Sequence, residues 1–62
     1  MVDNKVRERR KELGMTLKQL SEDSGLAVST LSEIELGREP GVKTAQKIAH
    51  ALNKSIDELW PD

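Results

Sequence analysis

The stretch TLKQLSEDSGLAVSTLSEIEL, residues 16–36, decides the fold of this 62-residue chain. It begins with Thr16 and has Gln19 three residues later, which is the spacing of a capping box and predicts the start of a short helix. Gly25 is expected to end that helix, because glycine readily adopts the left-handed backbone geometry found at helix ends. Two leucines of this helix should face inward, Leu17 and Leu20.

The second half of the stretch predicts another short helix, over residues 28–36. Its apolar residues recur at every third position, as expected for one side of a helix: Val28, Leu31 and Ile34. Gly37 follows and should end this helix. Only a few residues separate the two helices, so they must be joined by a tight turn, with small Ser21 where the helices cross.

Further helices are predicted on both sides of this pair. Before it, Val6 and Leu13 lie seven residues apart, which returns to one side of a helix that Gly14 should end. After the turn residues 38–41, an amphipathic stripe predicts a fourth helix that ends at Asn53. A second capping box opens a last helical turn through Trp60. The stripe and the capping box consist of Val42, Ala45, Ile48, Ala49, Leu52, Ser55 and Glu58.

Five short helices without any alternating strand pattern predict an all-α fold, and we expect residues 1–62 to form a single domain. A chain of this length buries only roughly 60% of the surface that its unfolded form exposes. It has no cysteine, so hydrophobic packing must hold the fold together rather than disulfides or thiolate metal sites.

Composition also excludes several classes of function. The chain has one histidine, His50, which its spacing places on the polar side of the fourth helix, and its carboxylates are scattered. No catalytic dyad, triad or closed metal site can be assembled, so we expect no enzyme activity, no cofactor and no small-molecule ligand. No apolar run approaches the roughly 20 residues of a membrane span, and the first residues have no signal-peptide character. We therefore expect a soluble cytoplasmic protein without a membrane partner.

Charge is unevenly distributed along the chain. The net charge is -1, but residues 1–20 hold six basic and three acidic side chains, a balance of +3, whereas residues 21–62 hold four and eight, a balance of -4. Such polarity either turns a basic surface toward a nucleic acid or reflects ordinary solvated helix surfaces. Charge alone leaves both interpretations open.

The chain resembles the Cro/C1-type helix-turn-helix family, also called the XRE family, of phage repressors and small bacterial regulators. This resemblance implies a compact five-helix bundle of the lambda-repressor type, with the helix-turn-helix core at residues 16–36. It also implies that Arg10 pairs with Glu35 and locks the first helix onto the third. The motifs that carry it are Arg7-Glu8-Arg9-Arg10, Leu13-Gly14-Met15-Thr16, Leu20-Ser21, Gly25-Leu26, Ser29-Thr30-Leu31-Ser32, Ile34-Glu35, Gly37, Ile48-Ala49-His50-Ala51-Leu52 and Ser55-Ile56-Asp57-Glu58-Leu59-Trp60.

The resemblance also implies a partner, duplex DNA, with the third helix in the major groove. The residues that would face base edges are Ala27, Val28, Ser29, Ser32 and Glu33. Those expected at the DNA backbone are Thr16, Leu17, Lys18, Arg38 and Lys43.

This surface departs from the family pattern, in which polar residues are common where Leu17, Ala27 and Val28 stand. Ala27 and Val28 could pack on thymine methyl groups, and Glu33 could accept a hydrogen bond from a cytosine amino group. Alternatively, Val28 is partly core and the remaining candidates are ordinary surface residues. Specificity would then depend more on DNA shape than on direct contacts to bases.

Two functions remain open after these observations. The first is a sequence-specific transcriptional regulator, expected to be a repressor, which could bind as a homodimer. The second is a protein-interaction module, such as an antitoxin or anti-repressor, that uses an apolar patch at Leu17 and Val28. Trp60 is either a lid on the core or an anchor between subunits, and Leu59 is the other candidate dimer contact.

Overall fold

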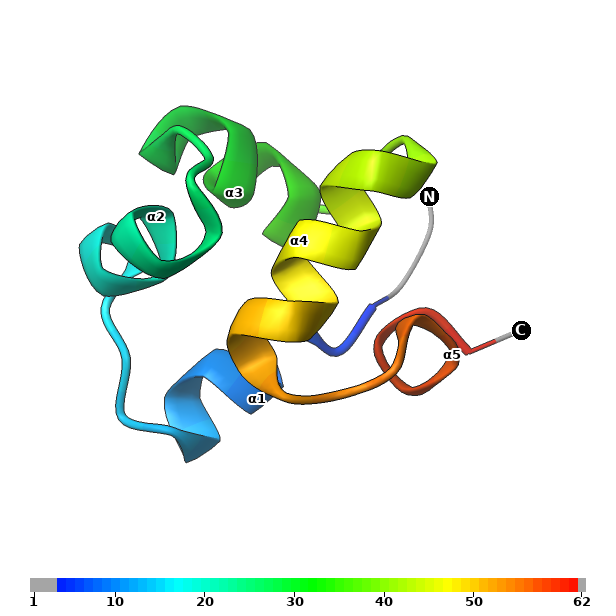
Figure 1. The fold of residues 1–62 in the computed structure, drawn as a ribbon, viewed down its shortest axis with the longest axis horizontal. Coiled ribbons are helices and arrows are strands. Elements are labelled where there is room, and N and C mark those ends of the chain that lie inside the picture. Colours follow the sequence, from blue (N-terminus) through cyan, green and yellow to red (C-terminus); the bar gives the residue numbers. More distant parts are fainter. Residues whose placement is uncertain (1–3, 62) are drawn as a thin grey trace.

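The computed structural model describes residues 4–61, and within them the chain forms five helices (Figure 1). No strand occurs in this part of the chain, so the all-α prediction and the predicted order of helices are confirmed. Nor is any helix of the described residues long and apolar enough to cross a membrane. The helices are α1 (Val6–Glu12), α2 (Leu17–Ser24), α3 (Val28–Glu35), α4 (Val42–Leu52) and α5 (Ile56–Leu59).

Capping boxes open two of these helices, as predicted. At the start of α2, the Thr16 hydroxyl accepts a hydrogen bond from the Gln19 amide at 3.1 Å, and the Gln19 side chain accepts one from the Thr16 amide at 2.8 Å. Ser55 and Glu58 make the equivalent pair of bonds at the start of α5. Each capping residue is expected to contribute about 1 kcal/mol, because it pairs amide groups that the helix itself leaves without partners.

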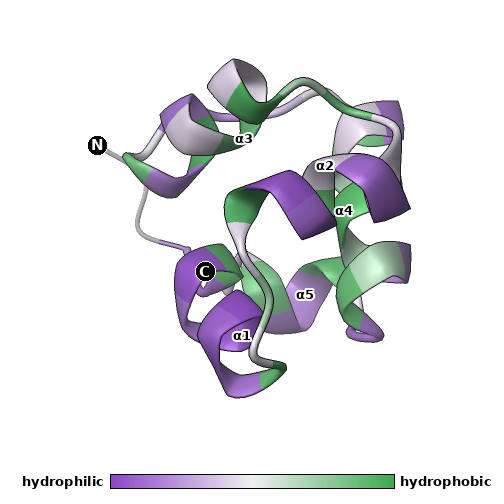
Figure 2. Ribbon diagram, turned by 90° about the vertical axis from the view of Figure 1, so that its left-hand side faces the viewer, coloured by the Kyte–Doolittle hydropathy of each residue, from purple (hydrophilic) through white to green (hydrophobic). Residues whose placement is uncertain are grey.

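Helix α4 is the centre of the bundle. It packs against α1, α2 and α5, and α2 also packs against α3 (Figure 1). Hydrophilic and hydrophobic segments alternate along the helices, as expected for helices that bury one side (Figure 2). The core consists of Val6, Leu20, Leu31, Ile34, Ala45, Ile48, Ala49, Leu52 and Leu59.

Three of the apolar residues in the predicted stripes lie outside this core. Leu13 and Val28 are each 42% exposed, and Val42 is 72% exposed. Each stands at or just beyond a helix end, since Leu13 caps the end of α1 and the two valines begin α3 and α4. The periodicity predicted the correct side of each helix, but the stripe residues at these helix ends remain exposed.

Candidate nucleic-acid interface

The turn between α2 and α3 is held at Leu26 by two serines of α2. The Ser21 hydroxyl donates to the Leu26 carbonyl at 2.5 Å, and the Ser24 hydroxyl accepts from the Leu26 amide at 3.3 Å. Gly25 has φ +74°, a left-handed conformation that other residues adopt at a cost. The turn thus fixes α3 relative to α2. The sequence indicated Ser21 and Gly25, but Ser24, which is 9% exposed, was missed.

Helix α3 buries one side and leaves the other open. Leu31 and Ile34 are 0% and 1% exposed. The open side carries the residues that were expected to face base edges: Ala27, Val28, Ser29 and Glu33 are exposed, and Ser32 is half-buried. Val28 lies on this open side rather than in the core. The structure therefore gathers all five predicted residues on one surface.

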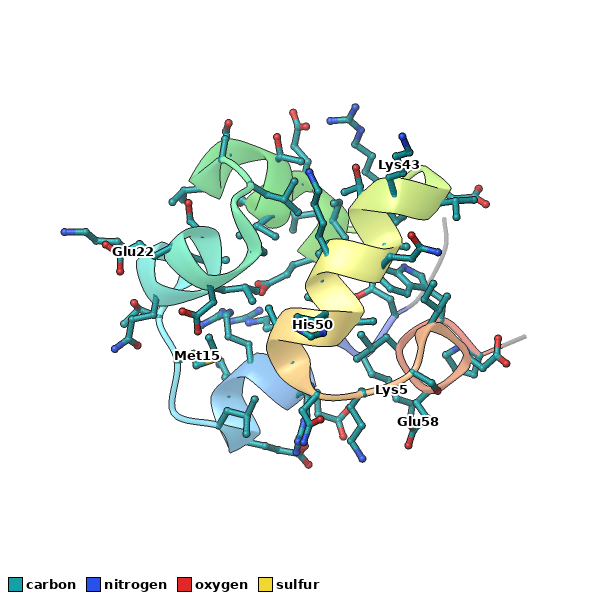
Figure 3. The ribbon with its side chains drawn as sticks, in the orientation of Figure 1. Lys5, Met15, Glu22, Lys43, His50 and Glu58 are labelled. Atoms are coloured by element: carbon teal, nitrogen blue, oxygen red, sulfur yellow. The ribbon has the colours of Figure 1, made fainter. Side chains whose placement is uncertain are left out.

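The residues expected at the DNA backbone are divided between the surface and the core. Lys18, Arg38 and Lys43 are exposed, and Lys43 projects from the start of α4 on the side of the molecule where α3 lies (Figure 3). Thr16 is exposed, but its hydroxyl already caps α2. Leu17 is half-buried and packs against the core, so its side chain has a structural role.

Arg10 and Glu35 form the expected pair between α1 and α3. Arg10 Nε donates to Glu35 Oε2 at 2.7 Å, and Nη2 donates to Oε1 at 3.2 Å, which makes a two-pronged contact. The third guanidinium nitrogen, Nη1, donates to the Met15 carbonyl at 2.8 Å. The side chains are only 11% and 7% exposed. The hydrogen bond that Arg10 donates to Glu35 raises the pKa of Arg10 against the opposing effect of burial, and the negative charge of Glu35 adds to the rise.

Two of the four basic residues of α1, Arg9 and Arg10, bond to other parts of the fold, whereas Arg7 and Lys11 are exposed. Besides Arg10, Arg9 donates from Nε to the Leu52 carbonyl at the end of α4, at 2.9 Å. Asn4 was also missed by the sequence analysis. Its amide nitrogen donates to the Ile34 carbonyl at 2.7 Å, and its oxygen accepts from the Val6 amide at 3.0 Å. The excess of arginine in residues 1–20 thus gives less support to a basic DNA-binding surface than its charge suggests.

Two residues expected to contact different parts of DNA are paired with each other. Arg38 Nη1 donates to Glu33 Oε1, and the side chains are 61% and 57% exposed. Glu33 lies on the open side of α3, whereas Arg38 follows the helix by three residues. Each of these residues is accessible, but neither carries an isolated charge in this structure.

The C-terminal residues proposed for a dimer contact differ in exposure. Leu59 is 1% exposed and belongs to the core, so the idea that its side chain meets a partner is wrong. Trp60 is half-buried and packs against that core.

His50 lies exposed on α4, as predicted (Figure 3). No group of three or more metal-ligating side chains occurs in the described part of the chain.

Comparisons with known proteins identify the family of this chain. A family model described as Helix-turn-helix matches residues 6–59. The chain belongs to the helix-turn-helix family. This confirms the resemblance drawn from the sequence, and the match extends across all five helices.

Members of the helix-turn-helix family that are similar to this chain include named regulators. The HTH-type transcriptional regulator SinR of Bacillus subtilis is 34% identical over 61 residues, which are 95% of this chain and 55% of SinR. An uncharacterized HTH-type transcriptional regulator of Methanothermobacter thermautotrophicus is 42% identical over 57 residues, 89% of this chain and 83% of that protein. The chain thus spans about half the length of SinR.

A solved structure of the same family has the same fold. The solution structure of the N-terminal DNA-binding domain of the master biofilm-regulator SinR from Bacillus subtilis aligns with a TM-score of 0.84 and 31% sequence identity. The alignment covers all of this chain and 93% of that one. The fold of this chain is therefore that of a helix-turn-helix DNA-binding domain.

Proposed function

We propose that this chain binds duplex DNA in a sequence-specific manner through α3 and regulates transcription by occupying a promoter as a repressor. The observation that supports this most is the open side of α3, which the buried Leu31 and Ile34 hold at the surface next to a fixed turn. An α-helix with its side chains is roughly 10–12 Å across, which fits the roughly 12 Å width of the major groove.

Each part of the open surface has a proposed role. Ser29 and Ser32 offer hydroxyl groups to base edges, and Ala27 and Val28 offer methyl groups to thymine. The start of α2 would bring amide groups to a phosphate, as helix N-termini do. Lys18 and Lys43 would contact the DNA backbone by charge. A cytoplasmic location is part of this proposal, because the protein must reach genomic DNA.

We also propose that the protein binds as a homodimer through the surface around Trp60. Trp60 Nε1 is buried and has no hydrogen-bond partner among the described residues. The indole borders a groove of about 320 Å³ that is lined by Glu39 and by apolar residues of α4, α5 and their flanking segments, and Val42 in this groove is 72% exposed. A two-fold dimer would bind half-sites roughly 34 Å apart.

Selection from a randomised duplex pool tests the DNA-binding proposal. The purified protein is mixed with the pool at low and at physiological salt, and the retained DNA is sequenced. We expect enrichment of one motif, with affinity falling as salt rises. Lysines that bind phosphates release the counterions condensed on the DNA, and added salt opposes this release. Ser29→Glu should weaken binding to that motif by more than about tenfold, since it adds a negative charge at the groove.

His50→Glu is the matched control, because it adds the same charge at an exposed position of α4. It should leave binding nearly unchanged. No enrichment at either salt concentration would overturn the proposal and favour a protein-interaction module.

The dimer is tested separately by light scattering with Val42→Lys, which should give monomers. A wild-type protein that is monomeric both alone and on its selected site would overturn the dimer.

A further inference from the structure

The position of Arg38 is fixed by the way α3 ends. The Gly37 amide donates to the Ile34 carbonyl at 3.0 Å, and the Arg38 amide donates to the Glu33 carbonyl at 3.0 Å. These two bonds, with Gly37 at φ +117°, form a Schellman motif in which the chain folds back over the last turn of the helix. The backbone thereby returns Arg38 to Glu33, and the side chains of the same two residues then meet in an ion pair.

Glu33 would be an obstacle to DNA binding if it stood alone. The other carboxylate of α3, Glu35, is neutralised by Arg10 and buried. Glu33 is the exposed one, on the side proposed to face bases, where phosphates would repel it. Because Arg38 carries the opposite charge, the pair is neutral as a unit and can approach the groove without that repulsion.

The pair also restricts what Glu33 can bind. A free glutamate has several rotamers, and holding one of them costs conformational entropy. The bond from Arg38 engages Oε1, which leaves Oε2 available to a donor on a base edge. In the major groove guanine and thymine present only acceptors to a polar group, adenine presents an acceptor beside its donor, and cytosine presents an amino donor. A carboxylate held in this way therefore matches cytosine.

We propose that Arg38 is a positioning residue for sequence recognition: it holds Glu33 for the amino group of a cytosine, and is not an independent phosphate contact. This inference rests on the proposed function, since it requires α3 to lie in the major groove. It replaces the separate roles that the sequence suggested for these two residues with one shared role.

The test compares motifs selected from a randomised duplex pool by the wild-type protein and by Glu33→Gln, Arg38→Ala and Lys43→Ala. We expect the wild-type motif to contain one position with roughly tenfold preference for cytosine, the size of a typical single-base effect. Both Glu33→Gln and Arg38→Ala should lose that preference at the same position. Lys43→Ala, the control for a phosphate contact, should weaken binding to all sequences alike and keep the preference.

The outcomes separate this inference from the proposed function. If Arg38→Ala binds more weakly but keeps the cytosine preference, Arg38 is a plain phosphate contact and the inference is overturned. The same holds if Glu33→Gln changes no position of the motif. If the wild-type protein selects no motif, the proposed function itself fails, and the inference falls with it. Circular dichroism checks that both variants are folded, as expected for substitutions at exposed side chains.

Discussion

Helix α3 carries two glutamates that are two residues apart, and each is paired with an arginine. Glu35 and Arg10 are 7% and 11% exposed and link α3 to α1, whereas Glu33 and Arg38 are 57% and 61% exposed at the proposed DNA surface. The chemical groups are the same, but the surroundings differ. The first pair is surrounded by protein and holds two helices together, and the second remains accessible to a ligand.

Burial changes what an ion pair does for the fold. An exposed pair contributes at most about 1 kcal/mol, because water and salt screen it. A buried pair adds little stability relative to well-packed apolar groups, but removal of one partner leaves an uncompensated charge and costs about 3–5 kcal/mol. The contributions of the two ion pairs of α3 to the free energy of unfolding can therefore be distinguished by experiment.

The largest effect is expected for Glu35→Ala, which leaves the Arg10 guanidinium buried without its carboxylate. We expect a loss of about 3–5 kcal/mol in the free energy of unfolding. A domain of 62 residues has roughly 3–9 kcal/mol in total, so this variant should lose at least about a third of its stability. Glu35→Gln, which keeps one acceptor oxygen, should lose less and remain measurable by urea denaturation with Trp60 fluorescence.

A double variant distinguishes loss of the pair from loss of packing. Arg10→Met with Glu35→Leu replaces both charges by apolar groups of similar length, and it should be about as stable as the wild type. If Glu35→Ala lowers the free energy of unfolding by no more than Glu33→Ala does, the proposed difference between the two pairs is wrong.

A smaller effect is expected for Arg38→Ala, which removes the exposed pair. Stability should fall by at most about 1 kcal/mol in low salt, and the difference from the wild type should nearly vanish at about 1 M salt. Urea denaturation at the two salt concentrations measures this. A loss that persists in high salt would show that the Glu33 pair supports the fold in the same manner as the Glu35 pair.

The fold could be predicted from the sequence where the signal is local. Both capping boxes depend on residues three positions apart, and Thr16 with Gln19 formed as predicted. Burial at helix ends depends on how far neighbouring helices extend, which periodicity does not contain. Leu13 and Val42 therefore belong to the apolar stripes but remain exposed.

The candidate site was predicted less completely, because its pairs depend on the turns. The Arg10 pair came from the family resemblance, since 25 residues separate it from Glu35. Arg9 was missed because its partner, the Leu52 carbonyl, is 43 residues away. The pair of Glu33 and Arg38 had a local signal, an acidic and a basic residue on either side of Gly37, which is the spacing that a Schellman motif brings together.

The smallest effect is expected at Glu58, an exposed glutamate at the start of α5 that pairs with Lys54. Hydrogen bonds from the Ser55 amide and hydroxyl, with the nearby charge of Lys54, lower the pKa of Glu58 below its ordinary value of 4.5. A carboxyl group whose pKa is lower in the folded state stabilises the fold above its unfolded pKa and loses that contribution as pH falls through the folded value. Stability should therefore decline slightly below pH 4.5 through this group.

Glu58→Gln tests this assignment, because α2 already has the neutral form of the same capping box, with Gln19 in the corresponding position. We expect Glu58→Gln to reduce the acid-induced fall in Tm, and Gln19→Glu to increase it, since that variant gives α2 a carboxylate of the same kind. Thermal melts from neutral pH to below 4.5 compare the three proteins. Identical acid profiles would mean that the capping carboxylate does not couple proton binding to folding.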